Sequence, residues 1–255
     1  MKIRAIILSA LILCGISAVI MYSRAAQPQQ KSSVITQAIN DKNTPMVIKN
    51  LILKMKEQME VNDDQFPELI KEVENYTNSC ADSASVAVLH SMLAEMYQNY
   101  YQRNQWTINQ RTQLSGYIPE DIRVWTSNLF TDKIKEEIDL SLRPTALLQN
   151  TPVSKFKDIL EIGKDSQTLR PTLYEFLAFR ALDIQPTVQI YKDLIAFQNK
   201  EPNMKSVLLT ELDYLRFLYG DKRDKESFEA YMNALDELYR NLASQNYAAE
   251  ILIAK

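Results

Sequence analysis

Residues 82–103 read DSASVAVLHSMLAEMYQNYYQR, and this stretch decides the fold class. Its large apolar side chains recur three and four residues apart, at Leu89, Met92, Leu93, Met96, Tyr97 and Tyr100. This spacing places them on one face of an α-helix. We therefore predict a helix over residues 82–103.

The same helical spacing recurs on both sides of this stretch, in residues 47–59, 173–181, 190–197, 204–219 and 228–242. Prolines stand just before apolar runs, as is typical of helix starts, at Pro67, Pro119, Pro171, Pro186 and Pro202. No segment alternates as a strand would. A break at residues 244–246 separates two helical runs, as in a tetratricopeptide-type step. We predict an all-α fold, an irregular helical-hairpin, tetratricopeptide-like α-solenoid.

Composition excludes several classes of protein. The 255 residues include four glycines, one histidine and two cysteines. Glycine-rich phosphate loops, Rossmann fingerprints and turn-rich β-sandwiches are therefore not expected. Neither are histidine-based metal sites or disulfide frameworks. We predict no cofactor and no metal.

The first residues have the order of an export signal. Lys2 and Arg4 precede an apolar run over residues 5–22, and the small-residue pattern Ser23-Arg24-Ala25 follows. The run is 18 residues long, almost enough to cross a bilayer. Residues 1–25 are thus a cleaved signal peptide or an uncleaved anchor held by residues 5–22, and residues 26–33 (AQPQQKSS) form a polar linker. We expect an exported bacterial protein of the periplasm or cell envelope.

The net charge and the cysteine content limit the classes of partner and of covalent cross-link that we expect. Residues 1–25 hold three basic side chains and no acid, so the remainder keeps 26 basic and 32 acidic side chains, a net charge of −6. An acidic chain repels phosphate backbones, which disfavours nucleic acid. Cys14 follows Leu13, which is not the small residue that a lipobox requires, so we interpret it as one more apolar residue. Only Cys80 would survive cleavage, and it could form no internal disulfide.

The residue types that could support catalysis have simpler structural interpretations. His90 lies one position off its apolar stripe, which favours a partly buried helix-flank histidine over a general base. Cys80 lies in a helix-to-helix turn, ten residues from that histidine. Adjacent acids such as Glu136 and Glu137 point about 100° apart on a helix, so solvated helix faces explain them better than paired carboxylates. We predict a protein that is not an enzyme.

Aromatic residues gather between positions 97 and 130. They are either core packing or a groove that binds a partner, and core packing is the favoured interpretation. The candidate partner-binding residues are Tyr100, Tyr101, Trp106, Arg111, Tyr117 and Trp125. We predict that residues 104–118 form an ordered loop, after which Pro119 starts a helix that carries Trp125.

Several strings resemble the amino-terminal helical region of large bacterial alpha-2-macroglobulin family proteins. They are residues 89–97 (LHSMLAEMY), 100–101 (YY), 108–112 (INQRT), 116–122 (GYIPEDI), 125–126 (WT), 128–130 (NLF), 147–149 (LLQ), 151–153 (TPV) and 170–178 (RPTLYEFLA). The resemblance covers roughly residues 45–255. It implies an exported protein related to endopeptidase inhibitors that trap proteases. The family's β-sandwich trap domains, bait segment and Cys-x-Glu-Gln thioester have no counterpart here, since Cys80 is followed by Ala81-Asp82-Ser83. No catalytic or bait residue is carried over.

Three functional hypotheses follow. The first is a non-catalytic helical module of an alpha-2-macroglobulin-like protein, with residues 34–255 as a helical domain truncated at its C-terminal end. Its partners would be downstream macroglobulin domains or an envelope protein, with no small-molecule substrate. The second is a free-standing envelope adaptor of helical repeats that binds a protein. The third, an envelope hydrolase, requires two acids that converge in a pocket with a raised pKa.

Overall fold

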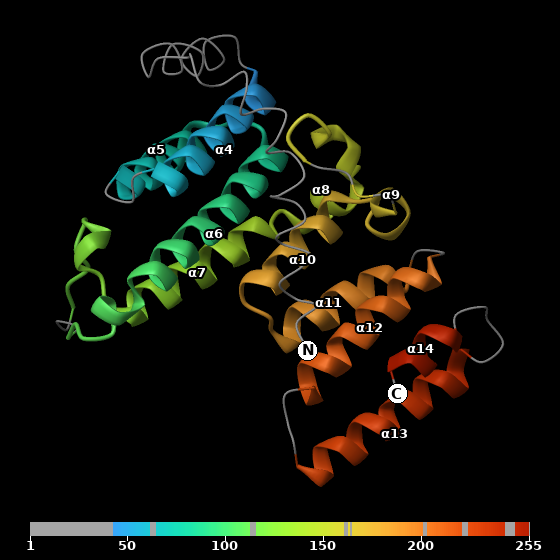
Figure 1. Cartoon of the computed structure of the whole chain (residues 1–255). Coiled ribbons are helices and arrows are strands. Elements are labelled where there is room, and N and C mark those ends of the chain that lie inside the picture. Colours follow the sequence, from blue (N-terminus) through green and yellow to red (C-terminus); the bar gives the residue numbers. More distant parts are fainter. Residues whose placement is uncertain are drawn as a thin grey trace.

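The computed structural model describes residues 43–61, 65–112, 116–160, 163, 165–200, 203–220, 224–242 and 248–254. Within these residues the chain is all-α and contains no strand, so the predicted fold class is confirmed at this level. The α-helices, drawn in Figure 1, are α4 (Thr44–Val61), α5 (Phe66–Ser79), α6 (Ser83–Ile108), α7 (Ser127–Ser141), α8 (Thr145–Asn150), α9 (Ser166–Leu169), α10 (Leu173–Ile184), α11 (Val188–Gln198), α12 (Met204–Tyr219), α13 (Lys225–Leu242) and α14 (Ala248–Ala254). The short 3₁₀ helices η2 (Ile122–Val124) and η3 (Val153–Phe156) lie between them.

Helix α6 is the central element. It begins where the Asp82 carboxylate accepts a hydrogen bond from the backbone N–H of Ser85, at 3.2 Å. It packs against α4, α5, α7 and α10. Its middle turns are buried almost all round and include small residues such as Ala87 and Ala94, which allow neighbouring helices to approach. The stretch that decides the fold class is therefore the core of the molecule.

Consecutive helices lie side by side along the rest of the chain, from α10 through α11, α12 and α13 to α14 (Figure 1). Their buried side chains form two clusters. A large one extends from α4 to α11, and a small one contains Leu208, Leu212, Leu235 and Ile251. The helices at the C-terminal end thus have a thin core of their own.

Prolines occur at helix starts in two structural roles. Pro67 occupies the first turn of α5, where its missing N–H leaves no partner unsatisfied. Pro171 and Pro186 each precede a threonine whose hydroxyl accepts a backbone hydrogen bond, Thr172 for α10 and Thr187 for α11. These starts agree with the prediction from the sequence.

The start of α10 combines a cap with a buried polar contact. Thr172 and Glu175 form a reciprocal capping box, and the buried Glu175 carboxylate also accepts a hydrogen bond from Gln198, at 3.2 Å. Glu175→Ala removes the carboxylate half of the capping box and the hydrogen bond that the buried Gln198 amide donates to it, so it should lower the free energy of unfolding by about 1–3 kcal/mol. Urea denaturation followed by circular dichroism measures this. Glu226→Ala, at an exposed first-turn glutamate of α13, is the control and should change stability by less than about 0.5 kcal/mol. Equal losses in the two variants would contradict the prediction.

Two predictions around α6 are wrong. Residues 104–108 are helical and not a loop, because Ile108 is completely buried and holds the last turn of α6 against the core. Pro119 starts no helix. The chain from Pro119 to Asp121 is irregular, η2 follows, and α7 begins only at Ser127. The indole N–H of Trp125 donates to the carbonyl of Pro119 at 2.7 Å, which ties this segment down without a helix.

The predicted signal or anchor (residues 1–25) and the linker (26–33) lie outside the described residues. Among the helices that the structure describes, none combines the length and the apolar character that crossing a bilayer would take.

Candidate functional site at the end of helix α6

The C-terminal end of α6 projects past the start of α7. The Tyr101 hydroxyl lies 3.0 Å from the Ser127 hydroxyl, which marks the point along α6 where α7 begins. About two further turns of α6 extend beyond Tyr101, and residues 116–126 lead from this end of α6 back to α7. Figure 1 shows this extension at the free end of α6.

A cluster of aromatic rings lies beneath this extension. The Phe130 ring contacts its four neighbours at centroid distances of 5.3 to 6.5 Å. Tyr97 and Trp125 also stack on each other at 5.6 Å, with 7° between their planes. We call this cluster the aromatic base: Tyr97, Tyr100, Tyr101, Trp125 and Phe130. Offset and tilted ring pairs add to the free energy of burying these side chains, so the base is a firm support.

The returning segment is fastened to the base by polar contacts. The Arg111 guanidinium donates to the backbone carbonyl of Trp125 at 2.8 Å. The Asp121 carboxylate accepts from the backbone N–H of Arg123 at 2.9 Å and begins η2. Arg123 also pairs with Glu68 of α5, at 2.5 Å. The segment is therefore attached both to the chain that leaves α6, through Arg111, and to α5, through Glu68.

Large apolar side chains on this extension face solvent. Trp106 is 78% exposed and Ile118 is 69% exposed, and Tyr117 and Val124 are also exposed. We call these four residues the α6 tip. Exposed tryptophan, tyrosine and large aliphatic side chains are typical of the surfaces through which proteins interact.

The structure separates the six predicted partner-binding residues. Tyr100 and Trp125 are buried in the aromatic base, where they support the surface and do not form it. Tyr101 is half-buried, and the contact of Arg111 with Trp125 is internal. Trp106 and Tyr117 are exposed. Ile118 and Val124, which are also exposed, were not among the predicted partner-binding residues. The position of Ile118 directly before Pro119, outside any helical apolar stripe, is a sequence signal that could have indicated its exposure.

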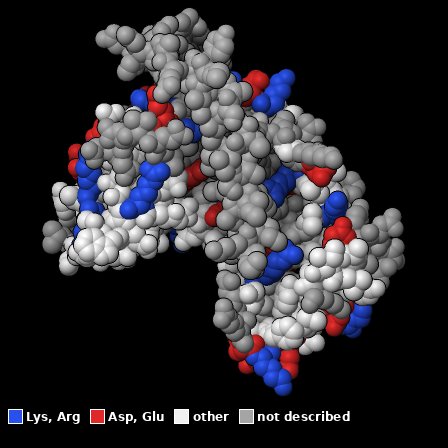
Figure 2. All heavy atoms as spheres, in the orientation of Figure 1, with Lys and Arg blue, Asp and Glu red and all other residues white. Residues whose placement is uncertain are grey.

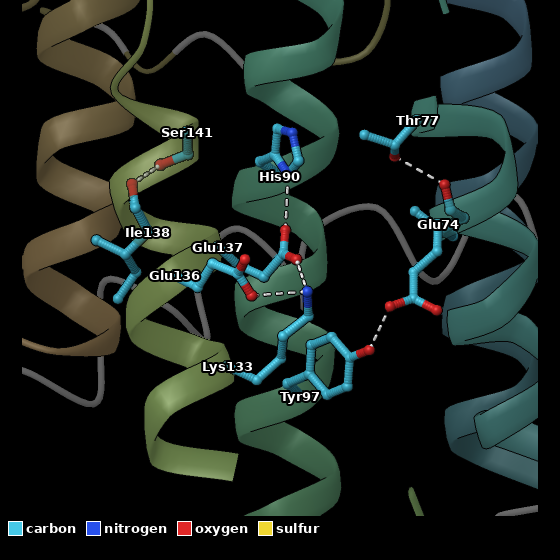
Figure 3. Close-up of polar contacts among 10 residues, drawn as sticks. Glu74, Thr77, His90, Tyr97, Lys133, Glu136, Glu137, Ile138 and Ser141 are labelled. Carbon is cyan, nitrogen blue, oxygen red and sulfur yellow. Dashed lines mark hydrogen bonds and ion pairs between the residues drawn. The ribbon is translucent and has the colours of Figure 1, made fainter. Parts of the chain in front are cut away.

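His90 forms part of an internal polar network between α6 and α7 (Figure 3). Its Nδ1 lies 2.7 Å from the Glu137 carboxylate, which also pairs with Lys133 at 2.8 Å. Burial opposes the charged form of Glu137, yet the hydrogen bonds from His90 and Lys133 hold the pKa of its carboxyl below its ordinary value. The partly buried histidine agrees with the prediction. The solvated position predicted for Glu137 is wrong, because its side chain is only 3% exposed.

Tyr97 extends this pattern to α5. Its hydroxyl donates to the Glu74 carboxylate at 2.6 Å, and burial raises the pKa of the Tyr97 phenol far above its usual range. Figure 3 shows these side chains directed inward between the three helices. The polar groups of this region brace α5, α6 and α7 against one another.

The hydrolase hypothesis requires two acids that converge in a pocket with a raised pKa. The acids in a surface hollow between α4 and α5 do not meet this requirement. In this hollow, of about 530 Å³, Glu68 pairs with Arg123 and Glu72 with Lys54. The pKa of Glu68 is lowered, chiefly by its hydrogen bond with Arg123. A general acid needs a raised pKa. The pKa of Asp183 is raised, because the desolvation of its carboxyl outweighs the effect of the nearby Arg170 and Arg180, and Asp213 adds negative charge. Asp183 is therefore an acid at which carboxylate chemistry would be sought.

Metal-ligating residues do not cluster in the part of the chain that the structure describes: no group of three or more histidine, cysteine or acidic side chains could hold an ion. Cys80 is half-buried at the end of α5, with its Sγ 3.9 Å from the carbonyl of Asp82. This is the small structural thiol that the sequence predicts.

The geometry defines the class of protein as an all-α helical assembly with an exposed aromatic tip. A scan against protein-family models found no matching family, and searches of the curated proteins and of the solved structures found no match either. The resemblance to alpha-2-macroglobulin proteins therefore rests on the sequence strings.

Proposed function

We propose that this chain is a non-catalytic helical binding module of an exported, cell-envelope protein, and that the α6 tip binds a protein partner. The observation that carries the proposal is the exposure of Trp106, Tyr117, Ile118 and Val124 on a segment fastened to a rigid aromatic base. Tryptophan and tyrosine contribute most strongly to protein interfaces. A surface that is already ordered loses little conformational entropy on binding.

The chemistry of the chain supports a protein as the partner. The net charge of −6 after residue 25 disfavours nucleic acid. The described His90, Cys80 and Glu137 have structural partners or structural positions. The α6 tip, by contrast, carries large apolar side chains that face solvent.

The family assignment that we propose is the amino-terminal helical module of an alpha-2-macroglobulin-like protein. Many of the strings that resemble the family fall in α6, the α6 tip and the start of α7, including residues 89–97, 108–112, 116–122 and 128–130. The partner would then be the downstream macroglobulin domains or an envelope protein, and endopeptidase inhibition by trapping would be the role of the whole protein.

The alternative is a free-standing envelope adaptor of tetratricopeptide-like repeats. It is supported by the side-by-side order of α10 to α14 and by the helix–break–helix of α13 and α14. An immunoblot of fractionated cells, with an antibody raised to residues 45–240, separates the two proposals. A band far above 29.5 kDa favours the macroglobulin-like protein, and a band near 29.5 kDa favours the adaptor.

The α6 tip can be tested by photo-crosslinking in cells. Benzoylphenylalanine placed at Trp106 or Tyr117 should yield a discrete crosslinked protein, because both side chains are exposed at the proposed interface. The same probe at Leu53, which is exposed on α4, is the control and should yield no such product. Trp106→Ala should abolish the product of the Tyr117 probe while it changes the free energy of unfolding by less than about 0.5 kcal/mol. Equal crosslinking from Leu53 and from the tip would contradict the proposal.

A further inference from the structure

Helix α4 has apolar side chains on two opposite faces. It packs against α5 and α6 (Figure 1), and its packed face, which contains Val47, Ile48 and Leu51, is almost completely buried. On the other side of the helix, Met46 is 41% exposed and Leu53 is 48% exposed. These two residues are seven positions apart, which is two helical turns, so they lie on one face.

Two exposed lysines lie along the same face. Lys49 follows Met46 by three residues, and Lys56 follows Leu53 by three residues. At about 100° per residue, the four side chains fall within an arc of about 80° on the helix surface. We call Met46, Lys49, Leu53 and Lys56 the α4 face. Among the residues that the structure describes, neither lysine of this face has an ion-pair partner.

The charges along this part of the chain have one sign. Residues 42–56 contain four lysines and no acid, and this stretch is bounded by Asp41 and Glu57. Glu57 has a polar interaction of its own, and Lys54 pairs with Glu72 of α5. On the described surface that Figure 2 shows, basic and acidic side chains lie close together. The charge that the α4 face leaves without a partner is therefore positive.

The sequence places a candidate membrane segment close to this face. Only 21 residues, 23–43, separate the apolar run over residues 5–22 from the start of α4. A chain of that length spans at most about 75 Å, so α4 stays near any bilayer that the run enters. Such a tether raises the local concentration of a surface, so a small area of contact is enough to keep it bound.

We propose that the α4 face lies on the surface of the bilayer that holds residues 5–22, with its lysines against anionic phospholipid headgroups. Met46 and Leu53 enter the boundary beneath the headgroups, as in amphipathic helices that lie along a membrane. The lysine stems reach the headgroup level, where negative charge attracts their ammonium groups. Four side chains are few beside the roughly 20–30 residues that each partner contributes to a stable protein interface. The inference rests on the proposed envelope location and is independent of the α6 tip.

The direct test measures how strongly lipid headgroups quench a fluorescent amino acid in the full chain, reconstituted into vesicles. The vesicles contain phosphatidylcholine alone or with about 30% phosphatidylglycerol, and a small fraction of the lipid carries a nitroxide on its headgroup. A probe in place of Leu53 should be quenched at least about twofold more strongly in the anionic vesicles. A probe in place of Val188, which is 40% exposed on α11, is the control and should show no such difference.

Matched variants test the role of charge. Lys49→Glu combined with Lys56→Glu should reduce quenching at Leu53 in the anionic vesicles to the level in phosphatidylcholine. Lys49→Arg combined with Lys56→Arg should preserve it, because the charge is kept. Lys135→Glu combined with Lys192→Glu, at exposed lysines of α7 and α11, is the control and should leave quenching unchanged. Circular dichroism should be the same for all of these variants, since each replaced side chain is exposed.

Three outcomes would overturn the proposal. Equal quenching of the Leu53 probe in the two kinds of vesicle would exclude attraction to anionic lipid. Failure of the full chain to float with either kind would remove the anchor, while the crosslinking test of the α6 tip would be unaffected. A discrete protein crosslinked through benzoylphenylalanine at Leu53 in cells would assign the α4 face to a protein partner.

Discussion

Phe130→Ala is expected to lower the free energy of unfolding by about 3–5 kcal/mol. The Phe130 ring is completely buried and contacts Tyr97, Tyr100, Tyr101 and Trp125, so its removal leaves a cavity in the middle of the aromatic base. Urea denaturation followed by circular dichroism measures the loss. It should appear as a lower midpoint at an unchanged dependence on denaturant.

The control for this prediction is the same substitution at an exposed position. Phe228 is 61% exposed on α13, so Phe228→Ala should cost less than about 1 kcal/mol. If the two variants lose equal stability, the aromatic base does not support α6 and α7 as described. Phe130→Ala should also reduce crosslinking from the α6 tip, because Trp125 holds both Pro119 and Arg111.

Glu137→Ala is expected to cost about 3–5 kcal/mol, the range for breaking a buried charged pair. Its carboxylate is buried, accepts a hydrogen bond from Lys133 and contacts His90, so its loss leaves two polar side chains without their buried partner. Glu136 is a matched control: it pairs with the same Lys133, at 2.9 Å, but its side chain is 58% exposed. Glu136→Ala should cost less than about 1 kcal/mol.

The same carboxylate predicts a dependence on pH. Hydrogen bonds from His90 and Lys133 overcome burial and hold the pKa of Glu137 below its ordinary value. A group with a lowered folded pKa stabilises the protein above its unfolded pKa, about 4.3, and loses that contribution as the pH falls through the folded pKa. Wild-type stability should therefore fall more steeply below about pH 4.3 than that of Glu137→Gln. Parallel curves from pH 7 to pH 3 would contradict this role.

Local sequence signals predicted most helix positions. The apolar spacing over residues 82–103 and the cap at Asp82 specify α6, and the prolines with their following threonines specify the starts of α10 and α11. These signals act over three or four residues, so they can be recognised without knowledge of the fold. They failed at the end of α6, because Ile108 continues the helix through a contact with the distant core.

The candidate site was only partly predictable. The sequence locates the aromatic cluster between residues 97 and 130. It does not distinguish an aromatic residue that becomes buried, such as Tyr100, from one that becomes exposed, such as Trp106. Where α7 begins beside α6 decides that Tyr100 is buried and Trp106 is exposed. Likewise, no sequence pattern joins His90 to Glu137, which are 47 positions apart.

By itself, therefore, the sequence determined that this protein is all-α, where several of its helices begin and which stretch is rich in aromatic side chains, because helix spacing and capping are local properties. Only the tertiary structure decided which aromatic residues form the base and which form the α6 tip, and that Glu137 is buried. These outcomes depend on which helices pack together, and such contacts join residues that are far apart in the chain.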